Sequence, residues 1–241
     1  MNSINIENQL TQLRLHGIKT SWKSLTETKR LGELSLPEGL EMLLQAEIQD
    51  RDNRRSDRLR KAAMFRYQAS IEELKYDASR GLDKGLITTL ATGDYIEKGG
   101  SILITGATGC GKSFICSALG HHACAQGYKV AYFNVQKLLQ RTKMARLEGT
   151  IHQFFQKISK THLLILDDFG LTHLEKQHQM DLMEIIEDRH ARSATMIVSQ
   201  LPVANWFDVI GEATIADAIL DRLVHTSYRI ELKGESLRRK M

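Results

Sequence analysis

Eight residues near the middle of the chain combine three glycines with a lysine and a hydroxyl in a fixed order, GATGCGKS at 106–113. This order fits the pattern G-x-x-x-x-G-K-[S/T] of a phosphate-binding loop, and the apolar run before it and the helical stretch after it supply the context that such a loop needs. A chance match in a chain of this length has a probability of roughly one in a hundred. The sequence therefore predicts a nucleotide site here.

The chemistry of phosphate binding accounts for each fixed position of the loop. The glycines allow tight turns that aim backbone N–H groups at phosphate oxygens, beside the positive end of the following helix. Lys112 is expected between the β- and γ-phosphates, the Ser113 hydroxyl is expected on Mg²⁺, and Cys110 contributes only its backbone amide. The predicted nucleotide-binding residues are Gly106, Ala107, Thr108, Gly109, Cys110, Gly111, Lys112, Ser113 and Phe114.

Two adjacent acids end the apolar run LLILDDFG at 163–170. The aliphatic residues suit a strand buried on both faces, and side chains alternate along a strand, so Asp167 and Asp168 cannot share one role. We expect Asp167 to hold Mg²⁺ together with Ser113, and Asp168 to act on the attacking water, which favours hydrolysis. Because Asp is shorter than Glu, that hydrolysis could be slow.

The elements that position these residues follow from the hydrophobic pattern. Short apolar runs alternate with helix-length stretches, which predicts an α/β fold with a mainly parallel five-stranded sheet and right-handed crossovers. The hydrophobic pattern of residues 1 to about 65 predicts helices instead. This helical region has one break, where Ser35, Pro37 and Glu38 fit the start of a new helix. We expect a small helical domain at 1–67 and a second domain at 68–241. The predicted strands are 101–105, 129–135, 162–167, 195–200 and 227–232.

Basic residues are unevenly distributed. The net charge of +4 is too small to imply nucleic acid by itself. Residues 51–66, however, hold seven basic residues against two acids. Two sets of basic residues are candidates for DNA binding. The first is Arg51, Arg54, Arg55 and Arg58, which share one helix face, and the second is Lys137, Arg141, Lys143 and Arg146. Each set fits either a solvated helix face or a phosphate-binding face.

The remaining composition excludes two classes of protein. No apolar stretch approaches the roughly 18 to 20 residues that span a bilayer, and the first residues lack the pattern of a secretory signal. We therefore expect a cytoplasmic protein without a membrane partner. Cys110, Cys116 and Cys124 match no common zinc spacing, and we interpret them as reduced thiols.

Several segments together resemble the IstB family, the helper ATPases of insertion-sequence transposition, which are related to the DnaC helicase loader. They are LATGDYIEKGGSILITGATGCGKS, LLILDDFG, IVSQLPVANW, DAILDRLVH and IELKGESLRRK. Many AAA+ ATPases share the first two, whereas the last three are far more specific. The resemblance runs from about residue 85 to the C-terminus and more weakly over the N-terminal helices. It implies an AAA+ P-loop NTPase fold and ATP as the nucleotide. Only nine residues follow SYRIEL, too few for a conventional C-terminal lid.

The same resemblance implies further site residues. Ser199 looks like the sensor-1 residue that orders the attacking water, and Arg238 is a weaker sensor-2 candidate. Arg222 resembles the arginine finger, which would reach the γ-phosphate of a neighbouring subunit. Such a contact makes each active site an interface, and repeated head-to-tail contacts give a ring or helical filament. The predicted catalytic residues are therefore Lys112, Asp168, Ser199 and Arg222.

The function that the resemblance implies is an ATP-dependent assembly on duplex DNA that recruits and stimulates a transposase, with hydrolysis driving disassembly. DNA contact would be mostly to phosphates and largely independent of sequence. A replicative helicase loader, a small-molecule kinase and a non-hydrolytic switch are the alternatives. ATP turnover that responds neither to duplex DNA nor to Arg222→Ala would favour the kinase.

Overall fold

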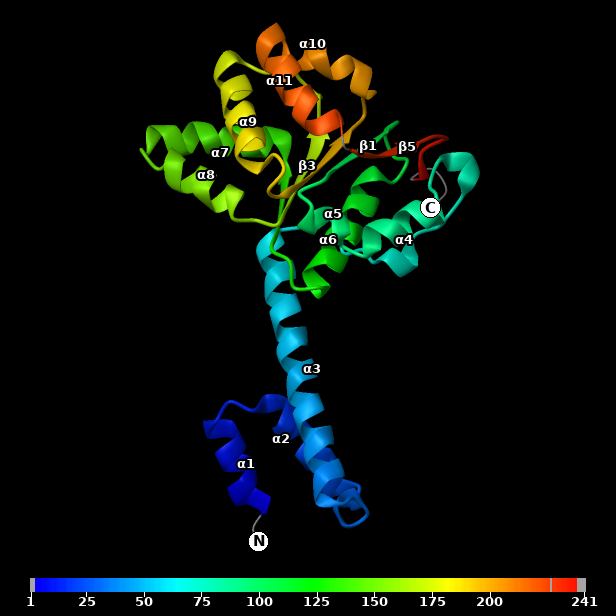
Figure 1. Ribbon diagram of the computed structural model, residues 1–241, viewed down its shortest axis with the longest axis vertical. Coiled ribbons are helices and arrows are strands. Elements are labelled where there is room, and N and C mark those ends of the chain that lie inside the picture. The colour runs from blue at the N-terminus through cyan, green and yellow to red at the C-terminus, as the bar shows by residue number, and fades with distance from the viewer. Residues whose placement is uncertain (1–2, 226, 238–241) are drawn as a thin grey trace. The chain divides into compact units, whose positions relative to one another are not determined.

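A computed structural model of the protein describes residues 3–225 and 227–237 (Figure 1). The chain divides into two compact units, Met1–Arg58 and Leu59–Met241, and each is described by itself. The units meet inside a helix, and a domain boundary after residue 67 stays a prediction. None of the helices in the described part of the chain is long and apolar enough to cross a membrane.

The first unit is helical. Its elements are α1 (Ser3–Gln12), α2 (His16–Glu27), the single turn η1 (Arg30–Gly32) and α3 (Leu36–Ala63), which continues into the second unit. The start of α3 agrees with the sequence, because the backbone amide of Ser35 donates to Glu38 over 2.9 Å and its hydroxyl donates to the same carboxylate. A second break, which the sequence does not predict, separates α1 from α2 at Arg14, whose φ is 58°.

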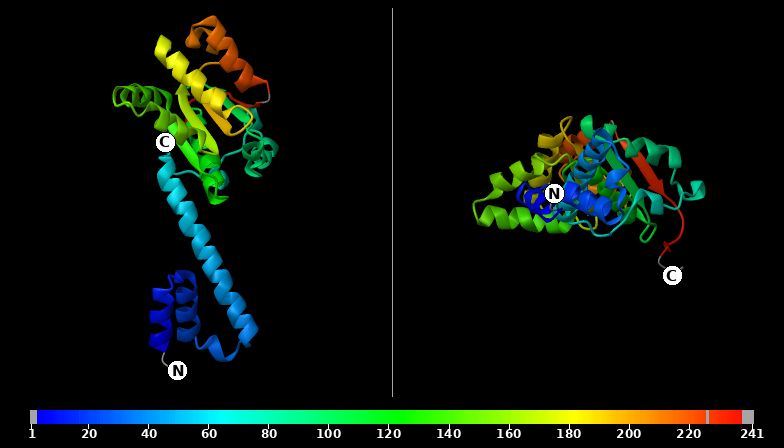
Figure 2. Two further views of the ribbon diagram at one scale, coloured as in Figure 1. Left: turned by 60° about the vertical axis from the view of Figure 1, so that its left-hand side comes forward. Right: turned by 90° about the horizontal axis from the view of Figure 1, so that it is seen from below.

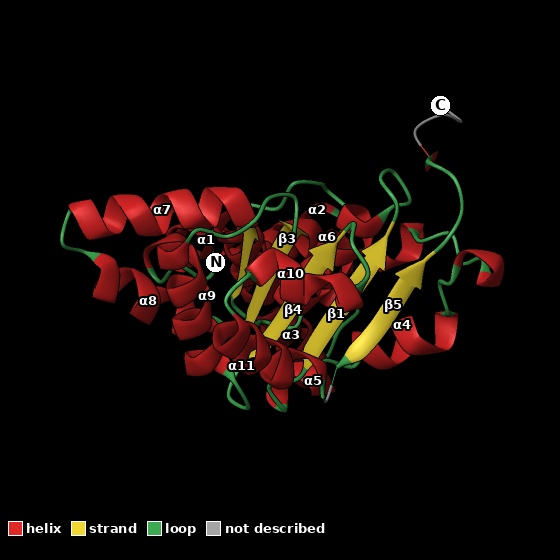
Figure 3. Cartoon of the chain, turned by 90° about the horizontal axis from the view of Figure 1, so that it is seen from above, coloured by secondary structure: helices red, strands yellow, loops and turns green. Residues whose placement is uncertain are grey.

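The second unit is built on a parallel sheet of five strands, which confirms the predicted α/β class. The strands are β1 (Ser101–Gly106), β2 (Val130–Asn134), β3 (Leu163–Phe169), β4 (Ala194–Ser199) and β5 (Tyr228–Leu232). They lie in the order β2-β3-β4-β1-β5, and every pair is parallel. The carboxyl ends of β1 and β3 therefore lie on either side of the end of β4, at one edge of the sheet (Figure 3).

Helices cover both faces of this sheet, which explains why its strands are apolar runs without alternation. One face packs against α4 (Lys84–Ala91), α5 (Asp94–Glu97) and α6 (Lys112–Ala125). The other packs against α7 (Val135–Leu147), α8 (Ile151–Ser159), α9 (Lys176–Arg189), α10 (Trp206–Ile210) and α11 (Ala213–Val224). Figure 2 shows α4 and the pair α7 and α8 on opposite sides of the strands. Single turns η2 (Ile71–Glu73), η3 (Ala78–Arg80) and η4 (Val203–Asn205) lie between these elements.

The end of α3 and the residues after it belong to the core of the second unit. Ala63 is buried, and the Phe65 ring lies 4.2 Å from the His121 ring on α6. Gly120 makes room for this packing, because a Cβ there would lie 2.4 Å from the Phe65 ring. The contact fixes the backbone on which the next residue, Arg66, reaches the end of β3.

Candidate functional site

The loop between β1 and α6 has the backbone geometry of a phosphate site. Gly106, Gly109 and Gly111 have φ values of 147°, 83° and 101°, a region that residues with a side chain rarely adopt. Gly111 is the N-cap of α6, so the first amides of a 14-residue helix lie beside the loop. Phe114, in the first turn of α6, packs against the core and anchors that turn.

Lys112 lies across this loop. Its ammonium is buried and donates to the carbonyl oxygens of Gly106 over 2.6 Å and Ala107 over 2.8 Å. No carboxylate of the described residues forms an ion pair with it. Its other contact among the described residues is with Sγ of Cys110, over 4.0 Å. A buried cation with these neutral partners fits an anionic ligand in the loop.

The two acids at the end of β3 have different surroundings. Asp167 is 1% exposed, whereas the side chain of Asp168 is 20% exposed. Asp168 has a φ of 60°, and the β3–β4 register shifts between Leu166 and Phe169, so the chain turns between the two carboxylates. The prediction that they do not share one role is consistent with this geometry.

Asp167 is held by two donors. The hydroxyl of Tyr132, on β2, donates to its Oδ2, and the backbone amide of Asp168 donates to its Oδ1 over 2.8 Å. Burial raises the pKa of Tyr132 well above its ordinary value, and the neighbouring Cys116 and Asp167 raise it further. The phenol therefore stays protonated at neutral pH and keeps its donor role.

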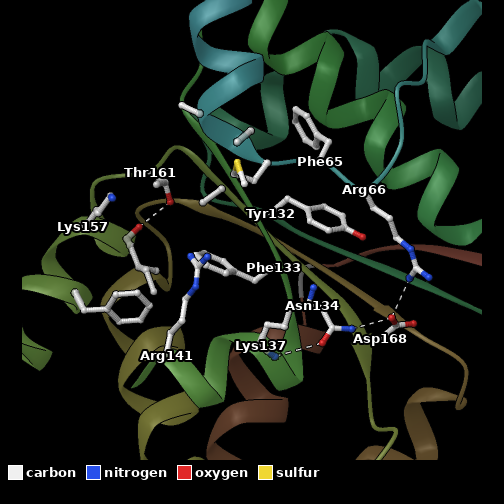
Figure 4. Close-up of a pocket in the computed structure, with 16 residues that line it drawn as sticks. Phe65, Arg66, Tyr132, Phe133, Asn134, Lys137, Arg141, Lys157, Thr161 and Asp168 are labelled. Carbon is white, nitrogen blue, oxygen red and sulfur yellow. Dashed lines mark hydrogen bonds and ion pairs between the residues drawn. The ribbon is translucent and has the colours of Figure 1, made fainter. Parts of the chain in front are cut away.

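Asp168 is held by two side chains that sequence reasoning missed in this role. Nδ2 of Asn134 donates to Oδ2 over 2.9 Å, and Nη1 of Arg66 donates to the same oxygen over 3.1 Å (Figure 4). Asn134 could have been found, because it ends the apolar run of a neighbouring parallel strand. No local pattern points to Arg66, because it lies 102 positions before Asp168 in the sequence.

The end of β4 presents two polar side chains to different neighbours. The buried Ser199 hydroxyl donates to the Phe169 carbonyl over 2.8 Å and accepts from the Leu201 amide over 3.0 Å. Gln200, the next residue, accepts a hydrogen bond from the Thr108 hydroxyl in the phosphate loop over 2.7 Å. The sensor role of Ser199 stays a prediction, while Gln200 is the residue in contact with the loop.

Arg222 lies at the opposite edge of the sheet from the phosphate loop. Its Nε is 2.5 Å from Oε2 of Glu187 on α9, and Nη1 donates to the Ala218 carbonyl. It lines a small cavity with Ser101 and Thr195, at the amino ends of β1 and β4. The length of β1 therefore separates it from its own loop, a span of ~17 Å. Arg238, the sensor-2 candidate, lies outside the described residues.

The predicted basic sets are partly engaged with acids. On α3, Arg51 pairs with Glu47 and Arg54 with Asp50, each over 2.7 Å. Arg146 on α7 donates to the buried Asp181. All eight residues are exposed, and four of them form no ion pair with a described carboxylate: Arg58, Lys137, Arg141 and Lys143.

A segment near the C-terminus also contacts the phosphate loop. The Leu237 amide donates to the Gly109 carbonyl over 2.9 Å, and a Cβ at Gly109 would lie 2.1 Å from Oγ of Ser236. Arg80 donates to the Cys110 carbonyl over 3.4 Å. This edge of the loop is therefore formed by parts of the chain that the loop motif does not include.

The protein ligands for a metal ion are few. Among the described residues there is no cluster of three or more His, Cys, Asp or Glu side chains that could hold one. Mg²⁺ is usually held by one or two side chains together with phosphate oxygens and water, so a magnesium site does not need such a cluster. The assignment of Ser113 and Asp167 as its ligands stays a prediction.

Comparisons with known proteins agree with this geometry. Residues 8–241 match the family model described as IstB-like ATP binding protein. An insertion sequence ATP-binding protein of Sinorhizobium fredii is 41% identical over 96% of this chain and 94% of its own length. The insertion sequence IS1162 ATP-binding protein of Pseudomonas fluorescens is 41% identical over 80% of this chain and 84% of its own length.

Solved structures show the same fold. The DnaC helicase loader superposes with a TM-score of 0.55 and 19% identity, over 73% of this chain and 99% of that one. Replication initiator DnaA from Aquifex aeolicus, bound to AMPPCP, superposes with a TM-score of 0.59 and 19% identity, over 73% of this chain and 53% of that one. The predicted AAA+ P-loop NTPase fold is confirmed.

Proposed function

Because the chain belongs to the family of IstB-like ATP binding proteins, we propose that it is an ATPase that assembles on duplex DNA and recruits a transposase. ATP with Mg²⁺ controls the assembly, and hydrolysis drives its disassembly. The assembly is a ring or helical filament of this chain. DNA contact is largely independent of sequence.

One observation carries the ATPase proposal: the buried Lys112 and the two differently placed acids of β3 lie at the same edge of one parallel sheet. Only β4 separates the strand that leads into the loop from the strand that carries the acids. In an open parallel sheet, ligands bind at the carboxyl ends of the strands. Lys112 and the acids of β3 can therefore contact a phosphate group and its attacking water in one site.

Each residue then has a distinct task. The loop amides and Lys112 bind the phosphates, with Lys112 exchanging the carbonyls of Gly106 and Ala107 for phosphate oxygens. Ser113 and Asp167 would hold Mg²⁺, which would supply positive charge to neutralise the phosphates. Asp168 accepts a hydrogen bond from the attacking water and aligns it, and it is the more exposed of the two acids.

The position of Arg222 supports an active site that is completed by a neighbour. Because it lies at the far edge of the sheet, it cannot serve the loop of its own subunit. In a head-to-tail assembly the far edge of one subunit meets the loop of the next. Release of Arg222 from Glu187 would then accompany assembly.

The exposed basic residues support contact with DNA. Arg58 on α3 and Lys143 on α7 are exposed, and neither forms an ion pair among the described residues. Such side chains can neutralise phosphates without breaking an existing pair. Arg51, Arg54 and Arg146 would each have to leave an acid first.

Sedimentation of the full chain with duplex DNA tests the proposal, in the presence of ATP or a non-hydrolysable analogue. We expect large oligomers only when nucleotide and DNA are both present. Lys112→Ala should abolish them because it weakens ATP binding, whereas the matched surface change Lys160→Ala should not. Oligomers that form equally well without nucleotide, or none under any condition, would overturn the assembly proposal.

A further inference from the structure

The second unit has a groove along the outer edge of β2, with a volume of about 640 Å³. Consecutive residues of β2, Ala131 to Asn134, line it. Alternate side chains of a strand point to opposite faces, so a groove lined by all four must lie along the edge of the strand. Among the described residues β3 is the only strand that pairs with β2, and this outer edge pairs with none.

The groove has two walls from different parts of the chain. One wall is the end of α3 with the residues that follow it, Ala62–Arg66. The other comes from α7 and α8, and Lys157 and Arg141 lie across the groove from Phe65 and Arg66 (Figure 4). The remaining lining residues of this wall are Lys137, Phe154 and Ile158, with Thr161 just beyond α8.

The charge of the lining is strongly positive. Four cationic side chains face a single carboxylate, Asp168, which Arg66 already pairs. Lys137, Arg141 and Lys157 form no ion pair with any described carboxylate. The guanidinium of Arg141 instead lies 5.4 Å from the centroid of the Phe133 ring. A ligand of opposite charge would therefore meet cations that need not break another pair.

The other properties of the groove favour an acidic peptide over a nucleic acid as its ligand. Much of its lining is apolar, including Phe65, Phe133, Phe154 and Ile158, which a phosphodiester backbone would leave uncovered. An edge strand also offers both N–H donors and carbonyl acceptors, and a phosphodiester backbone has no N–H to give those carbonyls. An extended peptide supplies both groups and alternates its side chains between the two walls.

We propose that this groove binds an extended, acidic segment of a partner protein as an added strand beside β2. The five residues of β2 match a segment of about five or six residues, or ~17 Å. Main-chain hydrogen bonds to the strand edge provide affinity, while carboxylates that pair with Arg141, Lys157 and Arg66 set the specificity for acidic sequences. Lys137 and Arg141 thereby contact protein rather than DNA.

Arg66 links the groove to the predicted water-activating acid. Its guanidinium lines the groove and also donates to Asp168. A carboxylate of the bound segment competes for this guanidinium and leaves Asp168 with Asn134 as its remaining side-chain donor. This consequence rests on the proposed role of Asp168 in hydrolysis, whereas binding in the groove does not.

Fluorescence anisotropy with the full chain, in the absence of nucleotide, tests the binding. The probes are labelled dodecapeptides in which pairs of Glu alternate with pairs of Val, pairs of Lys with pairs of Val, or pairs of Glu with pairs of Pro, so that charged side chains face both walls, and a 20-nucleotide single-stranded DNA. We expect the Glu–Val peptide to bind at least about tenfold more tightly than either other peptide, because the groove is cationic and proline cannot join a ladder. Lys157→Glu should weaken its binding by about tenfold or more.

Lys160→Glu is the matched control, since Lys160 is an exposed lysine at the end of α8 that does not line the groove. It should leave binding of the Glu–Val peptide unchanged. Equal binding of the Lys–Val or Glu–Pro peptide, or equal losses in both lysine variants, would overturn the proposal. A third outcome would also overturn it: the Glu–Val peptide does not bind, whereas the DNA binds and loses its binding in Lys157→Glu but not in Lys160→Glu. The occupant of the groove would then be nucleic acid.

ATP turnover with and without the Glu–Val peptide tests the link through Arg66. We expect the peptide to raise turnover in the wild-type chain, and Arg66→Met to raise basal turnover and remove the response. An unchanged response in Arg66→Met would overturn the link. A chain that binds the peptide but never hydrolyses ATP would contradict the proposed ATPase function and leave the groove as a docking site.

Discussion

The hydroxyl of Tyr132 donates a hydrogen bond to the carboxylate of Asp167, from the edge strand β2 to its neighbour β3. Both groups are buried, with 8% of Tyr132 and 1% of Asp167 exposed. A buried carboxylate is tolerated only where donors replace its water. Tyr132 therefore supplies one of the donors that this buried carboxylate needs.

We expect Tyr132→Phe to lower the free energy of unfolding by about 1–3 kcal/mol, because the change leaves a buried carboxylate short of one donor. Urea denaturation measures this loss. The matched control is Tyr128→Phe, whose hydroxyl donates to Glu97 at the surface and should contribute less than about 1 kcal/mol. Equal losses in the two variants would contradict the role assigned to Tyr132.

Ser199 and Gln200 are expected to affect different quantities. Ser199→Ala removes a buried hydroxyl that joins the ends of β3 and β4, so it should lower the free energy of unfolding by about 1–3 kcal/mol. Gln200→Ala removes a contact with the phosphate loop and should lower ATP turnover with little change in stability. Steady-state ATP turnover and urea denaturation of both variants separate the two roles. If Ser199→Ala lowers turnover without loss of stability, the sensor prediction for Ser199 stands. If Gln200→Ala leaves turnover unchanged, the role assigned to Gln200 fails.

Local patterns explain what the sequence could predict. The loop at 106–113, the apolar run before Asp167 and the helix start at Ser35 each depend on residues within about eight positions of one another. Their chemistry needs only a turn, a strand or a cap, and these are encoded by neighbouring residues. The parallel sheet could be predicted because its strands and helices alternate along the chain.

The features that could not be predicted from the sequence depend on contacts between distant segments. Arg66 reaches Asp168 because Phe65 packs in the space left by Gly120, and none of these residues forms a motif with another. The buried Arg189 donates to the carbonyl oxygens of Ile158 and Thr161, each over 2.9 Å, although an arginine in a polar helix usually predicts a surface position. Such roles depend on the strand order, which the hydrophobic pattern leaves open.

A mixing experiment tests whether Arg222 acts on a neighbouring subunit. Arg222→Ala and Asp168→Asn should each lose about 100-fold or more of ATP turnover while keeping nucleotide-dependent assembly. In an equal mixture, a subunit with Asp168 can meet a neighbour with Arg222 at about a quarter of the head-to-tail interfaces. Turnover of the mixture should therefore recover to about a quarter of the wild-type value.

Two outcomes of the mixing experiment would count against this arrangement. Turnover in the mixture that stays at the level of the single variants would place Arg222 outside the active site of the neighbour. Normal turnover of Asp168→Asn alone would remove the role assigned to that acid. Mixing Asp188→Asn, an exposed acid on α9, with Arg222→Ala controls for dilution of the inactive chain.

Arg146 is expected to stabilise the fold in a way that depends on pH. Its guanidinium donates to Asp181, which is 0% exposed. Burial alone would raise the pKa of this carboxyl, but hydrogen bonds, led by that from Arg146, outweigh burial and lower the pKa below the ordinary value of 3.8. Because the folded protein holds the carboxylate more strongly than the unfolded chain does, the pair contributes fully above about pH 4 and loses its contribution as the pH falls further.

Arg146→Met should therefore lower the free energy of unfolding at pH 7, and the difference from wild type should shrink as the pH falls below 4. Urea denaturation from pH 7 to pH 3 measures both, and Lys143→Met is the matched control on the same helix. Arg146→Met should weaken DNA binding less than Lys143→Met does, because Arg146 is engaged with Asp181. A large loss of DNA binding in Arg146→Met, with stability unchanged at pH 7, would show instead that this guanidinium is a phosphate contact.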